Sequence, residues 1–196
     1  MSELVKVLPV AEEPEETLSM NPKKFIVWMF VVSIVMLFAA MTSAYLVRRA
    51  EGNWLEFEMP AIFMYSTVVL IISSVSMHWA YRAAKKDDFG ALRIAISITF
   101  AFGLAFLVMQ FIGWRDLVAQ NVYFVGNPSG SFMYVFTGLH AFHLVSGLIV
   151  LLYALRAAFQ LKIHAKNLTQ LEVCMTYWHF LDILWVYLFG FLLYFN

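Results

Sequence analysis

Charged residues are scarce in this chain of 196 residues, where Asp, Glu, Lys and Arg together make up 13%. A soluble domain carries about 25% charged residues, so the shortage argues against a water-soluble fold and against a disordered chain. Acidic and basic residues number 13 each, which leaves no net positive charge to attract nucleic acid. Hydrophobic residues instead reach 62%, and this excess predicts a membrane protein.

Cysteine is almost absent, because Cys174 is the only one in the sequence. An intrachain disulfide needs two cysteines, and structural zinc or iron–sulfur sites use several. A disulfide-stabilised secreted module and a multi-cysteine metal site are therefore both excluded for this chain.

Five apolar stretches are each long enough to cross a bilayer, which takes about 20 residues. They cover residues 25–47, 59–81, 92–114, 132–155 and 173–195. The sequence thus predicts an all-α, polytopic membrane protein whose bundle of five transmembrane helices lies within a domain at 25–196. Residues 1–24 are rich in glutamate and proline and are predicted to form a tail outside the bilayer. Asn21 and Pro22 at its end are typical of a helix start.

The distribution of Lys and Arg predicts the orientation of the chain in the membrane. With five spans, the tail, the second loop and the fourth loop share one side, and they hold ten of the 13 basic residues. Cytoplasmic loops carry the excess of Lys and Arg. We therefore expect a cytoplasmic N-terminus and a C-terminus outside.

Ionisable residues inside a membrane are costly and usually face the interior of a helix bundle. Four of them lie in the last two predicted spans: His140, His143, His179 and Asp182. At about 1.5 Å per residue, His143 and Asp182 fall at nearly the same depth on consecutive helices. His179 shares a helix face with Asp182 at the i, i+3 spacing.

We interpret these four residues as a buried polar network that fixes helix packing, with Asp182 held by one or more histidines. Thr137, Tyr177 and Trp178 are expected to supply further hydrogen bonds. On this interpretation Asp182→Ala destabilises the fold more than Gln110→Ala, because it leaves buried partners unpaired.

Three alternatives compete with the network. The first is a metal or haem site that uses His140 or His143 with His179, although the residues beside these histidines are bulky. The second is a proton relay through the same side chains, for which the other three spans offer no continuation. The third is a small transporter, but substrate pathways normally draw polar groups from both halves of a bundle.

Small residues recur in several spans and are predicted to let helices approach closely. They include Ser73, Ser74 and Ser76 in the second span, and Gly138 and Gly147 in the fourth.

Two stretches carry a more specific signal. Residues 137–147 read T-G-L-H-A-F-H-L-V-S-G, and residues 177–189 read Y-W-H-F-L-D-I-L-W-V-Y-L-F. They resemble the T-G-x-H-x-x-H-x-x-x-G pattern and the C-terminal Y-W-H-F-x-D-x-x-W-x-x-L-F signature of haem-copper oxidase subunit III. The resemblance extends over all five spans, and further positions that match the family are Gln110, Gly138, Gly147 and Trp185. The chain is similar to the five-helix bacterial form, which lacks the first two of seven helices.

This resemblance implies a non-catalytic accessory subunit of a cytochrome c or quinol oxidase, in the bacterial cytoplasmic (inner) membrane. Members of the family pack on oxidase subunit I, support proton uptake and bind structural phospholipids. The chain itself is expected to bind no haem and no copper, which belong to the partner catalytic subunits. Other expected partners are subunit II and small subunits of the same complex, and a respiratory supercomplex is a further candidate assembly. The alternative function is a haem-binding membrane electron carrier that uses His143 and His179.

Two positions depart from the family pattern. The first shared helix usually carries a carboxylate where Ile34 stands here, and the helix with Gln110 usually has an acid where Gly113 stands. The roles of those acids in relatives, including proton feeding, are therefore not carried over to this chain.

Overall fold

The computed structural model describes residues 21–161, 163, 165 and 167–195. The described chain is all-helical, with α1 at Pro22–Ala50, α2 at Ala61–Lys85, α3 at Phe89–Ala119, α4 at Pro128–Phe159 and α5 at Thr169–Phe195. All five helices are long and apolar enough to cross a membrane, which confirms the predicted fold class and a multi-pass membrane protein. Each helix runs a few residues past the predicted span at one or both ends. The division into a tail at 1–24 and a membrane domain stays a prediction, because residues 1–20 lie outside the described ones.

Three of the helices begin at a side-chain cap that the sequence supplies. Asn21 accepts a hydrogen bond from the backbone N–H of Lys23 at 3.0 Å, as expected for the Asn-Pro start of α1. Asp88 does the same at α3, and Asn127 at α4, where proline again occupies the first turn. Each cap satisfies an amide that has no partner within the helix.

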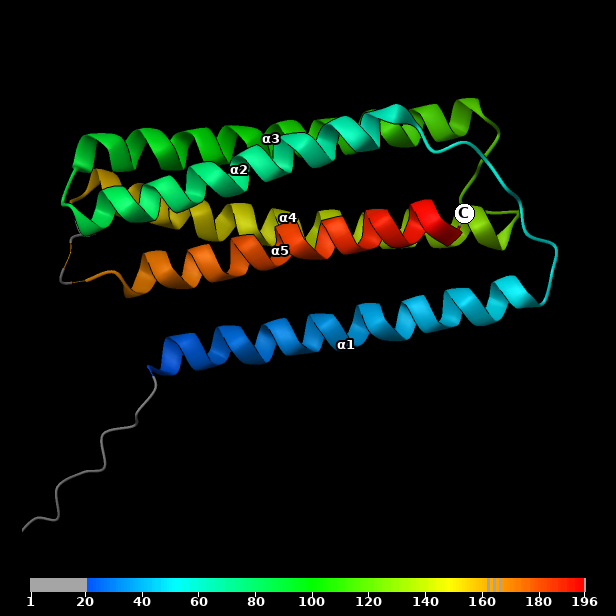
Figure 1. Ribbon diagram of the computed structural model, residues 1–196, viewed down its shortest axis with the longest axis horizontal. Helices are drawn as coiled ribbons and strands as arrows, with labels where there is room; N and C mark the ends of the chain where they lie inside the picture. The colour runs from blue at the N-terminus through cyan, green and yellow to red at the C-terminus, as the bar shows by residue number, and fades with distance from the viewer. Residues whose placement is uncertain (1–20, 162, 164, 166, 196) are drawn as a thin grey trace, which may run out of the picture.

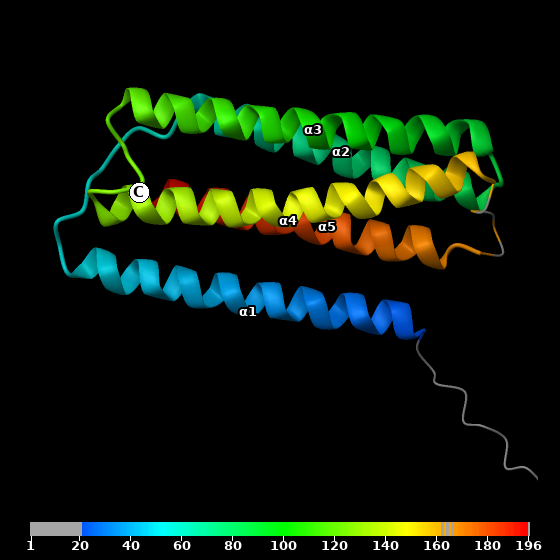
Figure 2. The same ribbon diagram turned by 180° about the vertical axis from the view of Figure 1, so that it is seen from behind.

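Four of the helices form a closed ring, and the fifth lies outside it. In the ring α2 contacts α3, α3 contacts α4, α4 contacts α5, and α5 returns to α2. Helix α1 contacts α4 and α5 but neither α2 nor α3. Figure 1 shows α2, α5 and α1 in that order on one face of the molecule, and Figure 2 shows α3, α4 and α1 on the opposite face. The chain must therefore cross the end of the ring between α1 and α2.

The crossing segment is held by the cap residue of α4. The Asn127 side chain donates to the carbonyl of Asn53 at 3.2 Å and accepts from the amide of Leu55 at 3.3 Å. One asparagine thus caps α4 and fastens the loop between α1 and α2. Figure 1 shows this loop at the same end of the bundle as the C-terminus.

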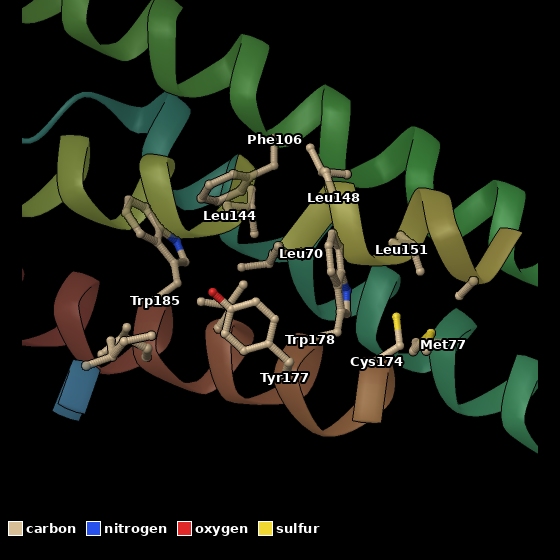
Figure 3. Packing of buried hydrophobic residues seen from close by; sticks show 14 of the residues in the cluster. Leu70, Met77, Phe106, Leu144, Leu148, Leu151, Cys174, Tyr177, Trp178 and Trp185 are labelled. Atoms are coloured by element: carbon tan, nitrogen blue, oxygen red, sulfur yellow. The ribbon is translucent and has the colours of Figure 1, made fainter. Parts of the chain in front are cut away.

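Large buried side chains fill the space between the helices, among them Trp178, Trp185 and Phe106 (Figure 3). Two of the glycines allow this close packing. Trp178 is fully buried. A Cβ added at Gly103 would lie only 2.7 Å from the Trp178 ring. A Cβ at Gly147 would lie 2.8 Å from the Leu181 side chain. The close approach predicted for Gly147 therefore holds. At Gly138 a Cβ would meet nothing within 4 Å, so the same expectation fails there.

Candidate functional site

A line of polar side chains joins α5 to α2 in the membrane interior, and we call it the polar seam. Its members are Thr67, Ser73 and Ser74 of α2 with Trp178, His179, Asp182 and Trp185 of α5. The indole N–H of Trp178 donates to Ser73 Oγ at 3.1 Å, and that of Trp185 donates to Thr67 Oγ1 at 2.9 Å. Lipid tails offer no partner to an indole N–H, so these bonds hold the two helices together.

His179 belongs to the seam, but it sits nearer the surface. Its Nδ1 lies 2.7 Å from Ser74 Oγ, which makes a third hydrogen bond between α5 and α2. The same nitrogen lies 3.8 Å from Asp182 Oδ2, which is beyond hydrogen-bond distance.

Asp182 is the member of the seam that has no hydrogen bond. It is the central residue of α5 and only 5% exposed. Neither of its carboxylate oxygens has a hydrogen-bond partner in the described part of the chain. The sequence predicted that histidines would hold this side chain, and only His179 comes near it.

Two similar bonds join neighbouring helices on the other sides of the ring. Gln110 of α3 donates from Nε2 to Ser66 Oγ of α2 at 3.2 Å. Trp114 of α3 donates from its indole to Thr137 Oγ1 of α4 at 2.9 Å, so Thr137 bonds to α3 rather than to Asp182 or a histidine. At the α2–α3, α3–α4 and α2–α5 interfaces, an indole or amide N–H on one helix therefore donates a hydrogen bond to a hydroxyl on the other.

His140 is fully buried in the centre of the ring. Its ring packs against Trp185, with centroids 5.0 Å apart, and against Phe106, with centroids 5.7 Å apart. Neither ring nitrogen has a hydrogen-bond partner among the residues that the structure describes. His140 thus acts here as an aromatic packing element that touches the polar seam at Trp185 without a hydrogen bond to it.

His143 faces α1 instead. Its Nδ1 lies 2.7 Å from the carbonyl of Leu139 on its own helix, and its ring packs against Phe30 and Phe38. Tyr177 lies on the same side, where its hydroxyl is 2.6 Å from Ser146 Oγ. This pair joins α5 to α4 beneath α1.

The residues predicted to form one network therefore occupy three separate environments. His179 and Asp182 face α2, His140 faces the interior of the ring, and His143 faces α1. The depths estimated from the sequence place them close together, but the rotation of each helix about its axis turns the side chains apart. A haem shared by His143 and His179 needs two facing imidazoles, and these two rings face different helices. No group of three or more metal-ligating side chains occurs within the described residues.

The family model for cytochrome c oxidase subunit III matches residues 16–196. The chain belongs to the cytochrome c oxidase subunit III family. It is 28% identical over 189 residues to cytochrome c oxidase subunit 3 of Bacillus sp. (strain PS3), covering 94% of this chain and 91% of the relative. It is 34% identical over 170 residues to the protein named "Probable cytochrome c oxidase subunit 3" of Mycobacterium tuberculosis, covering 84% and 82%. The corresponding protein of Thermostichus vulcanus is 31% identical over 171 residues, covering 82% and 81%. The chain is thus an accessory subunit of a haem-copper terminal oxidase.

Ile34 and Gly113, the two positions where the sequence was expected to depart from the family pattern, are both used for packing. Ile34 is buried on the face of α1 that meets the ring. A Cβ at Gly113 would lie 2.6 Å from the Phe63 ring of α2. The glycine lets Phe63 pack directly on the α3 backbone, so a carboxylate side chain has no room at this position.

Sequence reasoning missed the partners on α2. Ser66, Thr67, Ser73 and Ser74 accept or share the hydrogen bonds of the α2–α3 and α2–α5 interfaces. The signal is the cluster of hydroxyl residues in an apolar span, of which Ser73 and Ser74 were predicted only to permit close packing and Ser66 and Thr67 carried no prediction.

Proposed function

We propose that this subunit III packs on oxidase subunit I, also contacts subunit II, and keeps the assembled enzyme intact during turnover. The complex lies in the bacterial cytoplasmic membrane, with the N-terminus of the chain on the cytoplasmic side and the C-terminus outside. The excess of Lys and Arg on the N-terminal side supports this orientation. The names of the relatives favour cytochrome c as the electron donor of the complex.

The observation that supports a structural role is that polar side chains inside the membrane form hydrogen bonds between helices. Trp114, Trp178, Trp185 and Gln110 each donate to a hydroxyl on a neighbouring helix. Interhelical hydrogen bonds of this kind fix the packing of membrane helices. They support a rigid body that braces a larger partner. Support of proton uptake is then indirect, through the position of subunit I, because Ile34 and Gly113 carry no proton.

Structural phospholipids are the further ligands that we propose. A hollow of about 270 Å³ at the cytoplasmic end of the bundle is lined by Lys24, Trp28, Tyr81 and Glu172, among others. Lys24 Nζ lies 2.7 Å from Glu172 Oε2, and Trp and Tyr are enriched at the level of lipid headgroups. An amine and a carboxylate beside two amphipathic rings suit a zwitterionic headgroup.

The test is an oxidase from a strain in which this chain is deleted. We expect the haem spectrum and the initial rate to match those of the complete enzyme, while activity decays faster during continuous turnover. The control is the same strain carrying the wild-type chain on a plasmid. An enzyme that assembles and lasts equally well without the chain would refute the proposal.

A further inference from the structure

The outer face of α5 forms an open groove between α1 and α2. Because α1 contacts neither α2 nor α3, α5 is left uncovered along a strip that faces the viewer in Figure 1. Ile183, Val186 and Tyr187 on this strip are 69%, 47% and 48% exposed. Two hollows of about 370 and 340 Å³ lie on the α2 side and the α1 side, and both are lined by Ile183 and Tyr187.

The α2 side of this groove contains the Asp182 carboxylate, which lacks a hydrogen bond within the described residues. Asp182 and Ser74 line the larger hollow together with apolar side chains. Asp182 is 5% exposed, and neither of its oxygens has a hydrogen-bond partner among the described residues. The nearest ionisable side chain is His179, whose Nδ1 lies 3.8 Å from Asp182 Oδ2 and already meets Ser74 Oγ at 2.7 Å. A carboxylate without a hydrogen bond is strongly unfavourable inside a membrane unless a donor reaches it. The groove therefore needs an occupant that supplies one.

The depth of Asp182 decides what kind of occupant can do so. It is the central residue of α5, so it lies near the middle of a hydrocarbon layer about 30 Å thick. Headgroup donors stay roughly 15 Å away at the edges of that layer, and acyl chains carry no donor. A lipid can fill the apolar hollows, but it cannot satisfy the carboxylate. A transmembrane helix with a donor side chain at mid-depth can do both.

We propose that this groove is the docking site for a transmembrane helix of another oxidase subunit, and that the helix donates a hydrogen bond to Asp182 from an Arg, Lys, Tyr, Trp or hydroxyl side chain. This inference rests on the proposed packing of this chain within the oxidase, and it identifies the groove on α5 as the surface that contacts the other subunit. Ile183 and Tyr187 form the apolar floor, and Asp182 fixes the register of the incoming helix.

Photo-crosslinking in the purified oxidase complex tests the groove. A photoreactive amino acid is placed at Ile183 or, as a matched control, at Phe142. Phe142 is 70% exposed and lies near the middle of α4, away from the groove. We expect the Ile183 probe to link to a transmembrane segment of another oxidase subunit, mapped by mass spectrometry, with a clearly higher yield than the Phe142 probe. Links from Ile183 only to lipid or to a second copy of this chain would overturn the proposal, and so would equal yields.

Two variants test the hydrogen bond itself. Asp182→Leu removes the acceptor at similar size, while Asp182→Asn keeps one carbonyl oxygen. With a tag on another oxidase subunit, we expect about a tenfold loss of co-purified chain for the leucine variant, the effect of one hydrogen bond to a charged group, and a smaller loss for asparagine. Undiminished co-purification of the leucine variant would overturn the role of Asp182.

Co-purification of the wild-type chain distinguishes a failure of this inference from a failure of the proposed function. Failure of the wild-type chain to co-purify would refute the proposed function. Wild-type co-purification without Ile183 links would refute only the docking groove.

Discussion

Truncating Gln110 is expected to destabilise the isolated chain more than truncating Asp182. Gln110 is 1% exposed and donates to Ser66 Oγ, so Gln110→Ala removes an interhelical hydrogen bond and leaves a cavity in the ring. Together these losses amount to about 1–3 kcal/mol. Asp182→Ala removes a carboxylate that has no hydrogen bond within the described chain, so we expect a change of less than about 1 kcal/mol. This order reverses the one expected from the sequence.

The measurement is unfolding of the purified chain in mixed detergent micelles, followed by circular dichroism as the denaturing detergent is increased. Ser66 is a useful internal check, because its hydroxyl also donates to the Phe63 carbonyl at 2.9 Å and so stays partly bonded when Gln110 is lost. A control at Ile183, whose side chain is mostly exposed, should be neutral on truncation to alanine. If Asp182→Ala costs as much as Gln110→Ala, the carboxylate has an internal partner and the reasoning fails.

Three further changes have defined outcomes in the same unfolding assay. Gly113→Ala forces a methyl against the ring packed there and should cost about 1–3 kcal/mol, whereas Gly138→Ala meets open space and should leave the free energy of unfolding unchanged. Trp185→Phe should cost about 0.5–2 kcal/mol, and a double-mutant cycle with Thr67→Val should show coupling; additive losses would contradict their hydrogen bond. Glu172→Gln, at the partly exposed ion pair with α1, should cost less than about 1 kcal/mol and nothing in high salt. A large cost that persists in high salt would contradict this.

The number and approximate positions of the helices, and the start of α1, could be predicted from the sequence. Apolar runs set where the chain can cross a bilayer, and the Asn21–Pro22 pair marked the start of α1 where the structure places it. Asn127 and Pro128 cap and begin α4 in the same way, so the fourth helix starts four residues before the predicted span.

The rotation of each helix could not be predicted, and it decides the candidate site. Depth along a helix follows from counting residues, and on that basis His143 and Asp182 are expected at similar heights. Which neighbour each one faces depends on how all five helices pack, and in apolar spans no amphipathic pattern fixes this. His143 meets α1 and Asp182 meets the groove beside α2. For the same reason the hydroxyls of Ser73 and Ser74 could not be assigned to Trp178 and His179 in advance.

The position of α1 outside the ring sets an order on assembly during synthesis. Helix α1 leaves the ribosome first, yet the helices that it contacts, α4 and α5, are the last two made. Until α4 and α5 are inserted, α1 therefore lies in the bilayer without its helix partners from this chain. Its composition suits this stage, because it is the most apolar of the five by hydropathy and no charged residue occurs between Phe25 and Val47. A charged side chain on α1 would face lipid until α4 and α5 are inserted, which is costly.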